Sequence, residues 1–434
     1  MSAGTEPDGG GGTGRPPLGR RDFVAGAGAG AAALFGATGA GPSTAHASTG
    51  HASTAHVAPA HTAPPYAAPL AGVGAGAGGG VVEGNLPGFH ALLRDGLRFP
   101  LAWGTSPVRD FRTWRRTARS KVEEHLLTER DGTPYDPSFD EAQREEADGY
   151  TRESVTLSLT RYERVRGLLL TPHGTGPFPA VLLLHDHGSR FDIGKEKLVR
   201  PWNDDVRLAS AQAWADRCFG GRFVGDELAR RGYAVLALDA LGWGDRGPLL
   251  YEQQQALAAN LLNLGSSLAG LMAREDVRAA RFLAGLDRVD RRRVAALGFS
   301  MGAFRAWQTA ALGDDVAAAA SVCWMTGLKE VMVPGNNILR GQSAYHMLHP
   351  GLARHLDFPD VASIAAPRPM LFFHGGQDTL FPAEGVRVAY GKLRAVWRAR
   401  HAGERLHTRV WPELGHVFTV PQQDEVFAWL DSVL

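Results

Sequence analysis

The feature that most constrains the fold of this chain is a series of short, almost continuous apolar runs in residues 151–434. Helix-like stretches separate these runs from one another. Strands that are buried on both faces have this composition, and parallel sheets contain such strands. The clearest examples are "PAVLLLH" (179–185), "YAVLALD" (233–239), "RVAALGF" (293–299) and "PMLFFH" (369–374).

Weaker patterns complete the predicted sheet. Residues 153–160 alternate apolar and polar side chains, as an edge strand with one exposed face does, and 165–171 follow after a charged turn. Residues 317–324 and 406–411 are further strand candidates. The predicted fold class is α/β: an eight-stranded, mostly parallel, doubly wound sheet with flanking helices, preceded by an antiparallel hairpin. Helices are expected near 221–231, 251–285, 301–312, 385–399 and 422–433.

The segment before the sheet divides into parts of different composition. Residues 85–150 are predicted to form an N-terminal helical extension, in which an amphipathic helix at 107–128 packs Trp114 and Val122 against the core. Residues 48–84 repeat a loose His-containing pentad and then become Gly-rich, which is typical of a solvated linker, although four histidines could weakly hold a metal. The predicted catalytic domain is 151–434.

Residues 1–47 have the order of a twin-arginine export signal. Arg20 and Arg21 precede Phe23 and a weakly apolar Gly/Ala stretch, and the small-residue site Ala45-His46-Ala47 follows. The alternative is an unstructured tail with a chance arginine pair. The stretch is too short and too rich in glycine for a stable membrane anchor. The sequence therefore predicts a precursor that uses the twin-arginine export machinery and a secreted, extracytoplasmic product.

The overall charge excludes some classes of partner. The 46 basic and 45 acidic residues give a net charge of +1, which does not suggest a nucleic acid or a membrane surface as partner. Cys218 and Cys323 are the only cysteines, too few for a disulfide framework or a zinc site. Two separate thiols are favoured over a disulfide, although spacing cannot decide the pairing.

Ser300 is the candidate nucleophile. It lies in "GFSMG", between Gly298 and Gly302, directly after an apolar run and before the helix-like "MGAFRAWQTAAL". A sharp strand-to-helix turn needs small neighbours and exposes the serine hydroxyl at the end of the sheet. The alternative is a glycine-rich turn whose serine only caps the helix.

An unactivated hydroxyl is a weak nucleophile, so a base and an orienting acid are needed. Asp378 in "HGGQDTLFP" and His416 in "WPELGHVF" each follow a predicted strand. The order Ser300, Asp378, His416 is that of nucleophile, acid and base in α/β-hydrolases. His416 is expected to take the Ser300 proton, and Asp378 to orient and stabilise the imidazolium. No cofactor or metal is needed for this chemistry.

Two backbone N–H groups are the candidate oxyanion donors. One belongs to Met301, directly after the nucleophile, and the other to His187, in the loop after the strand at 179–185. The run His185-Asp186-His187 could alternatively be a metal site. Adjacent residues on an extended strand point in alternating directions, which argues against that alternative.

The chain resembles the α/β-hydrolase superfamily over about 150–434, through "GFSMG", "HGGQDTLFP" and "LGHVF". Within it, "VRGLLLTP", "VLLLHDHG" and "IAAPRPMLFFHGGQDTLFP" are similar to the dienelactone hydrolase-like and acetyl xylan esterase-like branch. Glucuronoyl esterases of related fold have an arginine directly after the serine, where this chain has Met301. Their example keeps Glu330 open as an alternative acid. The resemblance implies a serine esterase for small acyl groups, including acetyl esters of carbohydrates.

Rival functions remain open at this level. A peptidase of the prolyl-oligopeptidase type has the same triad order, but residues 85–150 are too few for its propeller. A lipase or polyester hydrolase differs in acyl-chain preference, and a non-catalytic binding protein of this fold would usually lack a triad member.

The insert from Ser189 to Gly221 is the expected cap over the site. The loop 242–247 is expected to be structural, with a pairing of Asp245 and Arg246 near the site as the most that it contributes. Four tryptophans could either wall a pocket or fill the core: Trp202, Trp214, Trp243 and Trp324.

Overall fold

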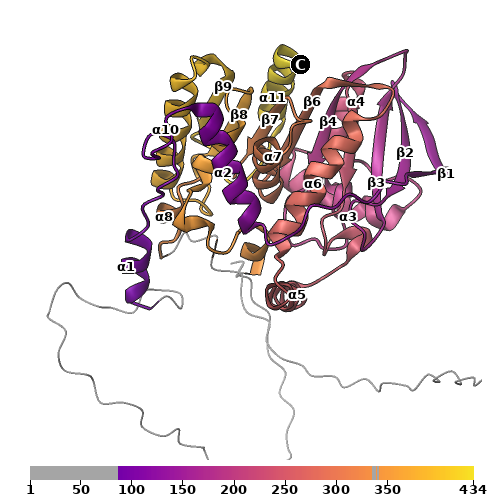
Figure 1. Cartoon of the computed structure of the whole chain (residues 1–434). Coiled ribbons are helices and arrows are strands. Elements are labelled where there is room, and N and C mark those ends of the chain that lie inside the picture. Colours follow the sequence, from indigo (N-terminus) through magenta and orange to yellow (C-terminus); the bar gives the residue numbers. More distant parts are fainter. Residues whose placement is uncertain (1–86, 335–338, 340–341) are drawn as a thin grey trace, which may run out of the picture. The chain divides into compact units, whose positions relative to one another are not determined.

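The computed structural model describes residues 87–334, 339 and 342–434; the predicted export signal and linker lie outside the described residues. The predicted α/β class is confirmed. A nine-stranded sheet has the order β1-β2-β3-β5-β4-β6-β7-β8-β9 (Figure 1). Its strands are β1 (Ser138–Ala147), β2 (Tyr150–Leu157), β3 (Val165–Pro172), β4 (Phe178–Leu184), β5 (Ala234–Leu238), β6 (Val289–Phe299), β7 (Ala318–Val322), β8 (Met370–Gly375) and β9 (Leu406–Trp411).

The sheet has an antiparallel part and a parallel part. β1, β2 and β3 form an antiparallel meander, and β3 also pairs antiparallel with β5. All pairs from β5 through β4, β6, β7 and β8 to β9 are parallel. The carboxyl ends of the parallel strands therefore meet at one edge, where α/β sheets place their ligand sites.

The prediction of eight strands was wrong by one strand. β1 lies within the segment 85–150, for which only helices were expected, and it forms the edge of the sheet. β2 is consequently an interior strand and not the edge strand that its alternating pattern suggested. β1 and β3 supply main-chain partners on both sides of β2. Its alternating sequence arises because successive side chains point to the two different faces of the sheet.

Helices cover both faces of the sheet. α2, α6 and α7 lie side by side over one face (Figure 1), and α10 belongs to the same layer, whereas α3, α4 and α11 cover the other face. The helices are α1 (Phe89–Asp95), α2 (Phe111–His125), α3 (Asp205–Cys218), α4 (Val224–Arg230), α5 (Tyr251–Asn263), α6 (Leu268–Ala284), α7 (Met301–Leu312), α8 (Leu328–Val331), α9 (Phe358–Ala362), α10 (Ala383–Ala399) and α11 (Val420–Val433). Short 3-10 turns are η1 (Lys195–Lys197), η2 (Gly244–Arg246), η4 (Gln342–His346), η5 (Leu352–Arg354), η6 (Ser363–Ala365) and η7 (Gly403–Arg405).

The buried strands explain the apolar runs in the sequence. On β4, Leu182 and Leu184 belong to the core under α6 and α7, and Val181 and Leu183 belong to the core under α4 and α11. Successive side chains of a strand point to opposite faces, so a strand with helices on both sides must be apolar throughout. This double burial holds the carboxyl ends of the strands in fixed positions.

The stretch 251–285 forms two helices and not one. Ser267 ends the break between α5 and α6, where its hydroxyl accepts a hydrogen bond from Gly270 N and donates one to Leu126 O. In the described part of the chain no single helix is long and apolar enough to span a membrane; α5 and α6, bent by 89°, reach that length and hydropathy only as a pair.

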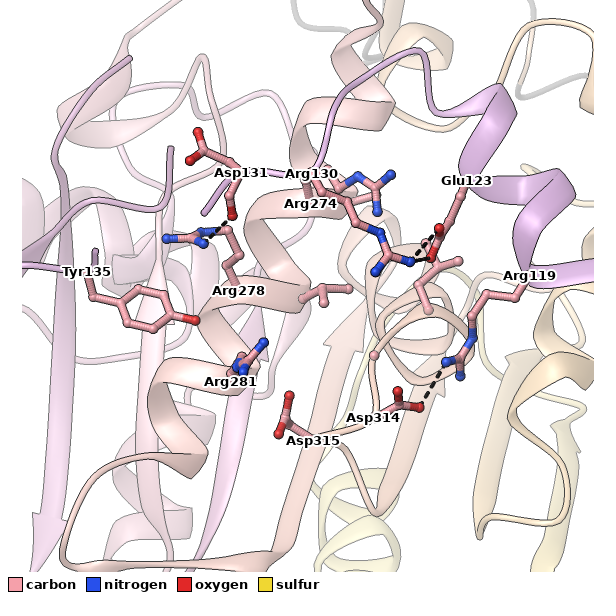
Figure 2. A pocket seen from close by; sticks show the side chains of 14 residues that line it. Arg119, Glu123, Arg130, Asp131, Tyr135, Arg274, Arg278, Arg281, Asp314 and Asp315 are labelled. Atoms are coloured by element: carbon pink, nitrogen blue, oxygen red, sulfur yellow. Dashed lines mark hydrogen bonds and ion pairs between the residues drawn. The ribbon is translucent and has the colours of Figure 1, made fainter. Parts of the chain in front are cut away.

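Arginine side chains fasten the N-terminal extension to the core. Arg278 of α6 donates to the carbonyl oxygens of Asp131 and Thr133, and Arg119 of α2 donates to Asp314 at 2.9 Å, next to the start of β7 (Figure 2). Arg119, Asp131, Arg278 and Asp314 line a cavity of about 400 Å³ between α2, α6 and the turn before β7. Residues 312–315 lie near the amino end of β7, so this cavity lies away from the edge that carries Ser300.

Candidate active site

Ser300 lies in a sharp turn between β6 and α7. Its backbone has φ 56° and ψ −125°, and its amide N–H donates to Val322 O of β7 at 2.8 Å. A positive φ is uncommon for a residue with a side chain and marks a strained position. The Ser300 side chain makes no capping hydrogen bond to α7. The turn therefore leaves the hydroxyl available for a partner outside the helix.

The glycines on either side of Ser300 are required by close backbone contacts. A Cβ on Gly298 would lie 2.1 Å from the carbonyl carbon of Gly302, and a Cβ on Gly302 would lie 1.8 Å from the carbonyl oxygen of Leu184. Both distances are far below contact distance. Gly302 thus lets the start of α7 press directly against the carboxyl end of β4.

The structure brings Ser300, His416 and Asp378 together. His416 Nε2 lies 2.8 Å from Ser300 Oγ, and His416 Nδ1 lies 2.6 Å from Asp378 Oδ2. Asp378 follows β8, His416 follows β9, and Ser300 follows β6, so all three lie beyond carboxyl ends of parallel strands. The arrangement can move a proton from the serine to the imidazole while a carboxylate orients the ring.

The surroundings of Asp378 keep its carboxyl group ionised. Its Oδ1 accepts from Leu380 N at 2.9 Å, which leaves Oδ2 for His416. Burial alone would raise the pKa of Asp378, but the hydrogen bond and charge of His416, with a contribution from His374, hold it below its usual value. Glu330, the alternative acid, lies in α8 with its carboxylate against Gly327. Asp378 is therefore the carboxylate that contacts His416.

The two predicted oxyanion donors lie on elements that touch each other. Met301 is the first residue of α7, where backbone N–H groups have no partner within the helix. His187 lies in the loop after β4, whose end is in contact with Gly302. The side chains of His185, Asp186 and His187 go to different partners, namely Ala240 N, Trp214 Nε1 and Gln254 Oε1, and do not converge on one point.

Several other predicted residues belong to the structure around the site. The two cysteines are free and buried, which confirms separate thiols. The four tryptophans are all at most 8% exposed and belong to the core, and none of them lines the cavity beside Asp378: Trp202, Trp214, Trp243 and Trp324. Trp202 instead borders a smaller cavity near Lys195. The insert 189–221 reaches the chain just after His416, because Cys218 O accepts from Phe418 N at 2.8 Å. Its function as a cap stays a prediction.

The predicted pairing of Asp245 with Arg246 was wrong. Arg246 instead binds Glu275 at 2.7 Å and also contacts Glu163. Asp245 binds Lys195. The two side chains diverge because η2 turns the chain between them.

Lys195 is the centre of a buried carboxylate cluster that sequence reasoning missed. Its Nζ lies 2.7 Å from Asp239, 2.8 Å from Asp245 and 2.9 Å from Glu196. Oxygens of these three acids converge closely enough to bind a metal ion. The lysine ammonium lies among these oxygens, and the Arg207 guanidinium also binds Glu196 and Asp245, so two cations of the chain itself offset much of the negative charge.

Aromatic rings and one cavity border His416 and Asp378. Phe299 and Phe381 pack against the His416 ring, with centroid distances of 4.9 and 6.3 Å. A cavity of about 380 Å³ is lined by Asp378, by His374 and by α10 residues such as Tyr390. The cavity of Figure 2 is slightly larger, but no residue of the Ser300 site lines it.

Comparison with known proteins fits this arrangement. A model of the dienelactone hydrolase family matches residues 219–428, which include Ser300, Asp378 and His416. The protein named "Putative hydrolase YtaP" of Bacillus subtilis (strain 168) is 30% identical over 283 residues, covering 65% of this chain and 88% of its own. The chain belongs to the dienelactone hydrolase family. Membership confirms the predicted branch and makes the chain a hydrolase.

Solved structures similar to this dienelactone hydrolase family member carry esterase names. A "putative acetyl xylan esterase" from Bacteroides fragilis NCTC 9343 has a TM-score of 0.61 at 18% identity, covering 80% of this chain and 94% of that chain. A glucuronoyl esterase from Solibacter usitatus has a TM-score of 0.54 at 15% identity, covering 76% and 96%. At these identities the likeness shows a shared α/β-hydrolase fold.

Proposed function

We propose that this dienelactone hydrolase family member is a serine esterase that cleaves carboxylic esters through an acyl-enzyme on Ser300. The observation that carries the proposal is the continuous hydrogen-bonded series from Ser300 Oγ through His416 to Asp378. Its position at the carboxyl ends of β6, β8 and β9 in a hydrolase fold supports a catalytic role over a structural one.

In the first half of the proposed reaction, Ser300 Oγ bonds to the ester carbonyl carbon while its proton passes to His416 Nε2. The carbonyl oxygen becomes an oxyanion, and the N–H groups of Met301 and His187 stabilise it. Collapse breaks the bond to the alcohol oxygen. His416 then donates its proton to the departing alcohol, and the acyl group remains on Ser300.

In the second half, water replaces the alcohol. His416 takes a proton from the water as its oxygen attacks the acyl carbon, and a second oxyanion forms in the same place. Collapse breaks the bond to Ser300 Oγ, which recovers the proton from His416, and the carboxylic acid leaves. Asp378 remains ionised throughout, because its pKa lies below its usual value, and it stabilises the imidazolium of both halves.

The proposed substrates are esters of small acyl groups, including acetyl groups on carbohydrates. The names of the similar solved structures, an acetyl xylan esterase and a glucuronoyl esterase, support this class. The proposed location is outside the cytoplasm, since Arg20, Arg21 and the Gly/Ala stretch after them have the order of a twin-arginine signal. Acylated polysaccharides outside the cell would then be within reach.

The esterase proposal is tested by hydrolysis of p-nitrophenyl acetate, butyrate and octanoate and of acetylated xylan, beside Ser300→Ala. We expect turnover to be fastest with acetate and kcat of Ser300→Ala to fall by about 10⁴-fold or more, since loss of a triad member leaves only residual catalysis. Equal activity of a folded Ser300→Ala variant sinks the proposal. Preference for octanoate would instead indicate a lipase.

The export proposal is tested by replacing Arg20 and Arg21 together with lysine in a host that has twin-arginine export. We expect the wild-type chain outside the cytoplasm and the double variant retained inside, measured by fractionation and immunoblotting. Export of the double variant at the wild-type rate would show that the arginine pair is not the signal.

A further inference from the structure

A second buried lysine lies two residues from Lys195 and contacts the loop of the predicted oxyanion donors. Lys197 ends η1 and is 0% exposed. Lysine is rare in this chain, and a fully buried lysine is exceptional in any protein. The proposed reaction assigns it no step, so its burial calls for an explanation.

The ammonium of Lys197 binds two successive carbonyl groups of that loop. Its Nζ donates to Asp186 O at 3.1 Å and to His187 O at 2.9 Å. The indole N–H of Trp243 donates to the same His187 oxygen at 2.8 Å. Three hydrogen bonds from two side chains, Lys197 and Trp243, therefore hold these two neighbouring peptide groups.

This arrangement orients the N–H groups of the same two peptides. In a trans peptide the C=O and N–H point in opposite directions. Because the carbonyls of Asp186 and His187 both point at Lys197, the N–H groups of His187 and Gly188 both point away from it. Gly188 has φ +48°, a left-handed conformation. Successive N–H groups that point the same way form an anion-binding nest.

Lys197 forms a buried ion pair with a side chain of the loop that it contacts. Asp186 Oδ1 lies 3.5 Å from Nζ, and the ring of Trp214 lies 5.2 Å away. Burial lowers the pKa of Lys197, and the neighbouring Asp186 carboxylate opposes that effect. Burying an ion pair costs desolvation free energy that the attraction between its two charges does not fully return, so the remaining hydrogen bonds of the ammonium matter. Those bonds go to the backbone of this loop.

We propose that Lys197 is a positioning residue for the oxyanion hole, and that the hole uses the N–H of Gly188 beside those of His187 and Met301. The lysine holds the two peptide groups from behind and polarises them, so that their N–H groups are fixed before the reaction begins. This inference rests on the proposed function. The contact between Gly302 of α7 and Leu184 of β4 places Met301 beside the same loop.

The test compares Lys197→Met with the wild-type full chain, since methionine keeps an unbranched stem without charge or donors. On p-nitrophenyl acetate we expect kcat to fall about 10- to 100-fold with KM within about threefold, less than loss of a whole oxyanion donor. Butylboronic acid, whose serine adduct carries a tetrahedral anionic centre, should bind more weakly by a similar factor. A merely structural role would not move boronate affinity and kcat together.

Lys195→Met is the matched control, because Lys195 is equally buried in the same turn and makes no hydrogen bond to the loop. We expect a lower Tm but kcat and boronate affinity within about threefold of wild type, per mole of folded protein. If that variant does not fold, Lys392→Met replaces it, since Lys392 binds Asp357 and is partly exposed. An equal loss in the control would overturn a specific role for Lys197.

The outcomes separate this inference from the proposed function. If Ser300→Ala is inactive while Lys197→Met keeps wild-type activity and wild-type boronate affinity, only the inference about Lys197 is overturned. If Ser300→Ala is active, both the inference and the proposed function are overturned. Loss of kcat without loss of boronate affinity also contradicts the positioning role. If Lys197→Met does not fold, Lys197→Gln, which keeps one amide donor, is measured by the same criteria.

Discussion

At the scale of single residues, the site depends on how the two oxygens of one carboxylate are shared. Leu380 N occupies Oδ1 of Asp378, and His416 occupies Oδ2. The hydrogen bond from Leu380 N fixes the orientation of the Asp378 carboxylate. The carboxylate, held in this way, fixes the orientation of the His416 ring. If an amide NH₂ replaced Oδ2, it would donate an N–H to His416 Nδ1. This would favour the tautomer with its proton on Nε2, which cannot accept the proton of Ser300.

Asp378→Asn should therefore lower kcat on p-nitrophenyl acetate by about 10⁴-fold, as loss of the orienting carboxylate does in a serine triad. Glu330→Gln is the control, because its carboxylate lies against Gly327 and not against His416. We expect the control to stay within about threefold of wild type. A large loss in Glu330→Gln with an active Asp378→Asn would exchange the two roles.

Residues with a motif could be predicted from the sequence, and residues that act through the backbone could not. Ser300, Asp378 and His416 each follow a predicted strand, so their order and their nearness were both predictable. Lys197 and Gly188 matter through peptide orientation, which no spacing rule describes. One signal of an unusual role was present in the composition. Only five of the 46 basic residues are lysines, and two of these five, Lys195 and Lys197, lie two positions apart.

At the scale of elements, the site depends on how closely α7 approaches β4. Gly302 permits a backbone contact that no other residue allows, and Arg305 on the next turn forms a two-point ion pair with Asp276 of α6 at 2.6 and 2.9 Å. Both contacts fix the direction in which α7 leaves the turn. The position of the Ser300 hydroxyl follows from that direction.

Gly302→Ala should destabilise the protein by about 3 kcal/mol or more, because its Cβ would overlap the Leu184 carbonyl and nothing but backbone can move. Gly391→Ala is the matched comparison, an exposed glycine within α10 with nothing near the added Cβ. We expect it to raise stability by about 0.5–1 kcal/mol through helix propensity. Urea unfolding of both variants checks the prediction; similar changes in the two would contradict it.

Among the described strands, those with a periodic or apolar pattern were predicted, and the strand without one was missed; α3, inside the insert 189–221, was a helix that the sequence did not predict. The eight expected strands all exist, and all of them except β9 contain buried apolar side chains. β1, "SFDEAQREEA", has mostly exposed polar and charged side chains and no buried residue. Its main-chain pairing with β2 holds it in place, and such pairing leaves no periodic signal in the sequence.

At the scale of the whole molecule, an unusual number of histidines is buried in the neutral form. Burial lowers the pKa of His187, His349 and His374 to about 4, and it lowers the pKa of His185 and His346 well below the usual value. In the unfolded chain these rings titrate near pH 6.5. Below that pH the unfolded state binds more protons than the folded state, so stability falls as pH falls.

Each of the three histidines whose pKa is lowered to about 4 should remove up to about 1.4 kcal/mol of unfolding free energy per pH unit between about pH 6.5 and 4, and His185 and His346 act in the same direction. We expect urea unfolding to show a much smaller free energy at pH 5.5 than at pH 7.5. In His349→Gln the difference between the two pH values should shrink by about 1 kcal/mol, because one titrating ring is gone. An unchanged difference in that variant would contradict this account.

The carboxylate cluster around Lys195 has a consequence for the conditions in which the protein can work. Glu196, Asp239 and Asp245 converge as the ligands of a bound cation would, but the positive charge among them belongs to the chain itself. A covalently tethered counter-ion cannot be diluted, chelated or exchanged. The junction between the insert and the end of β5 therefore holds together independently of how much calcium or magnesium the surroundings offer.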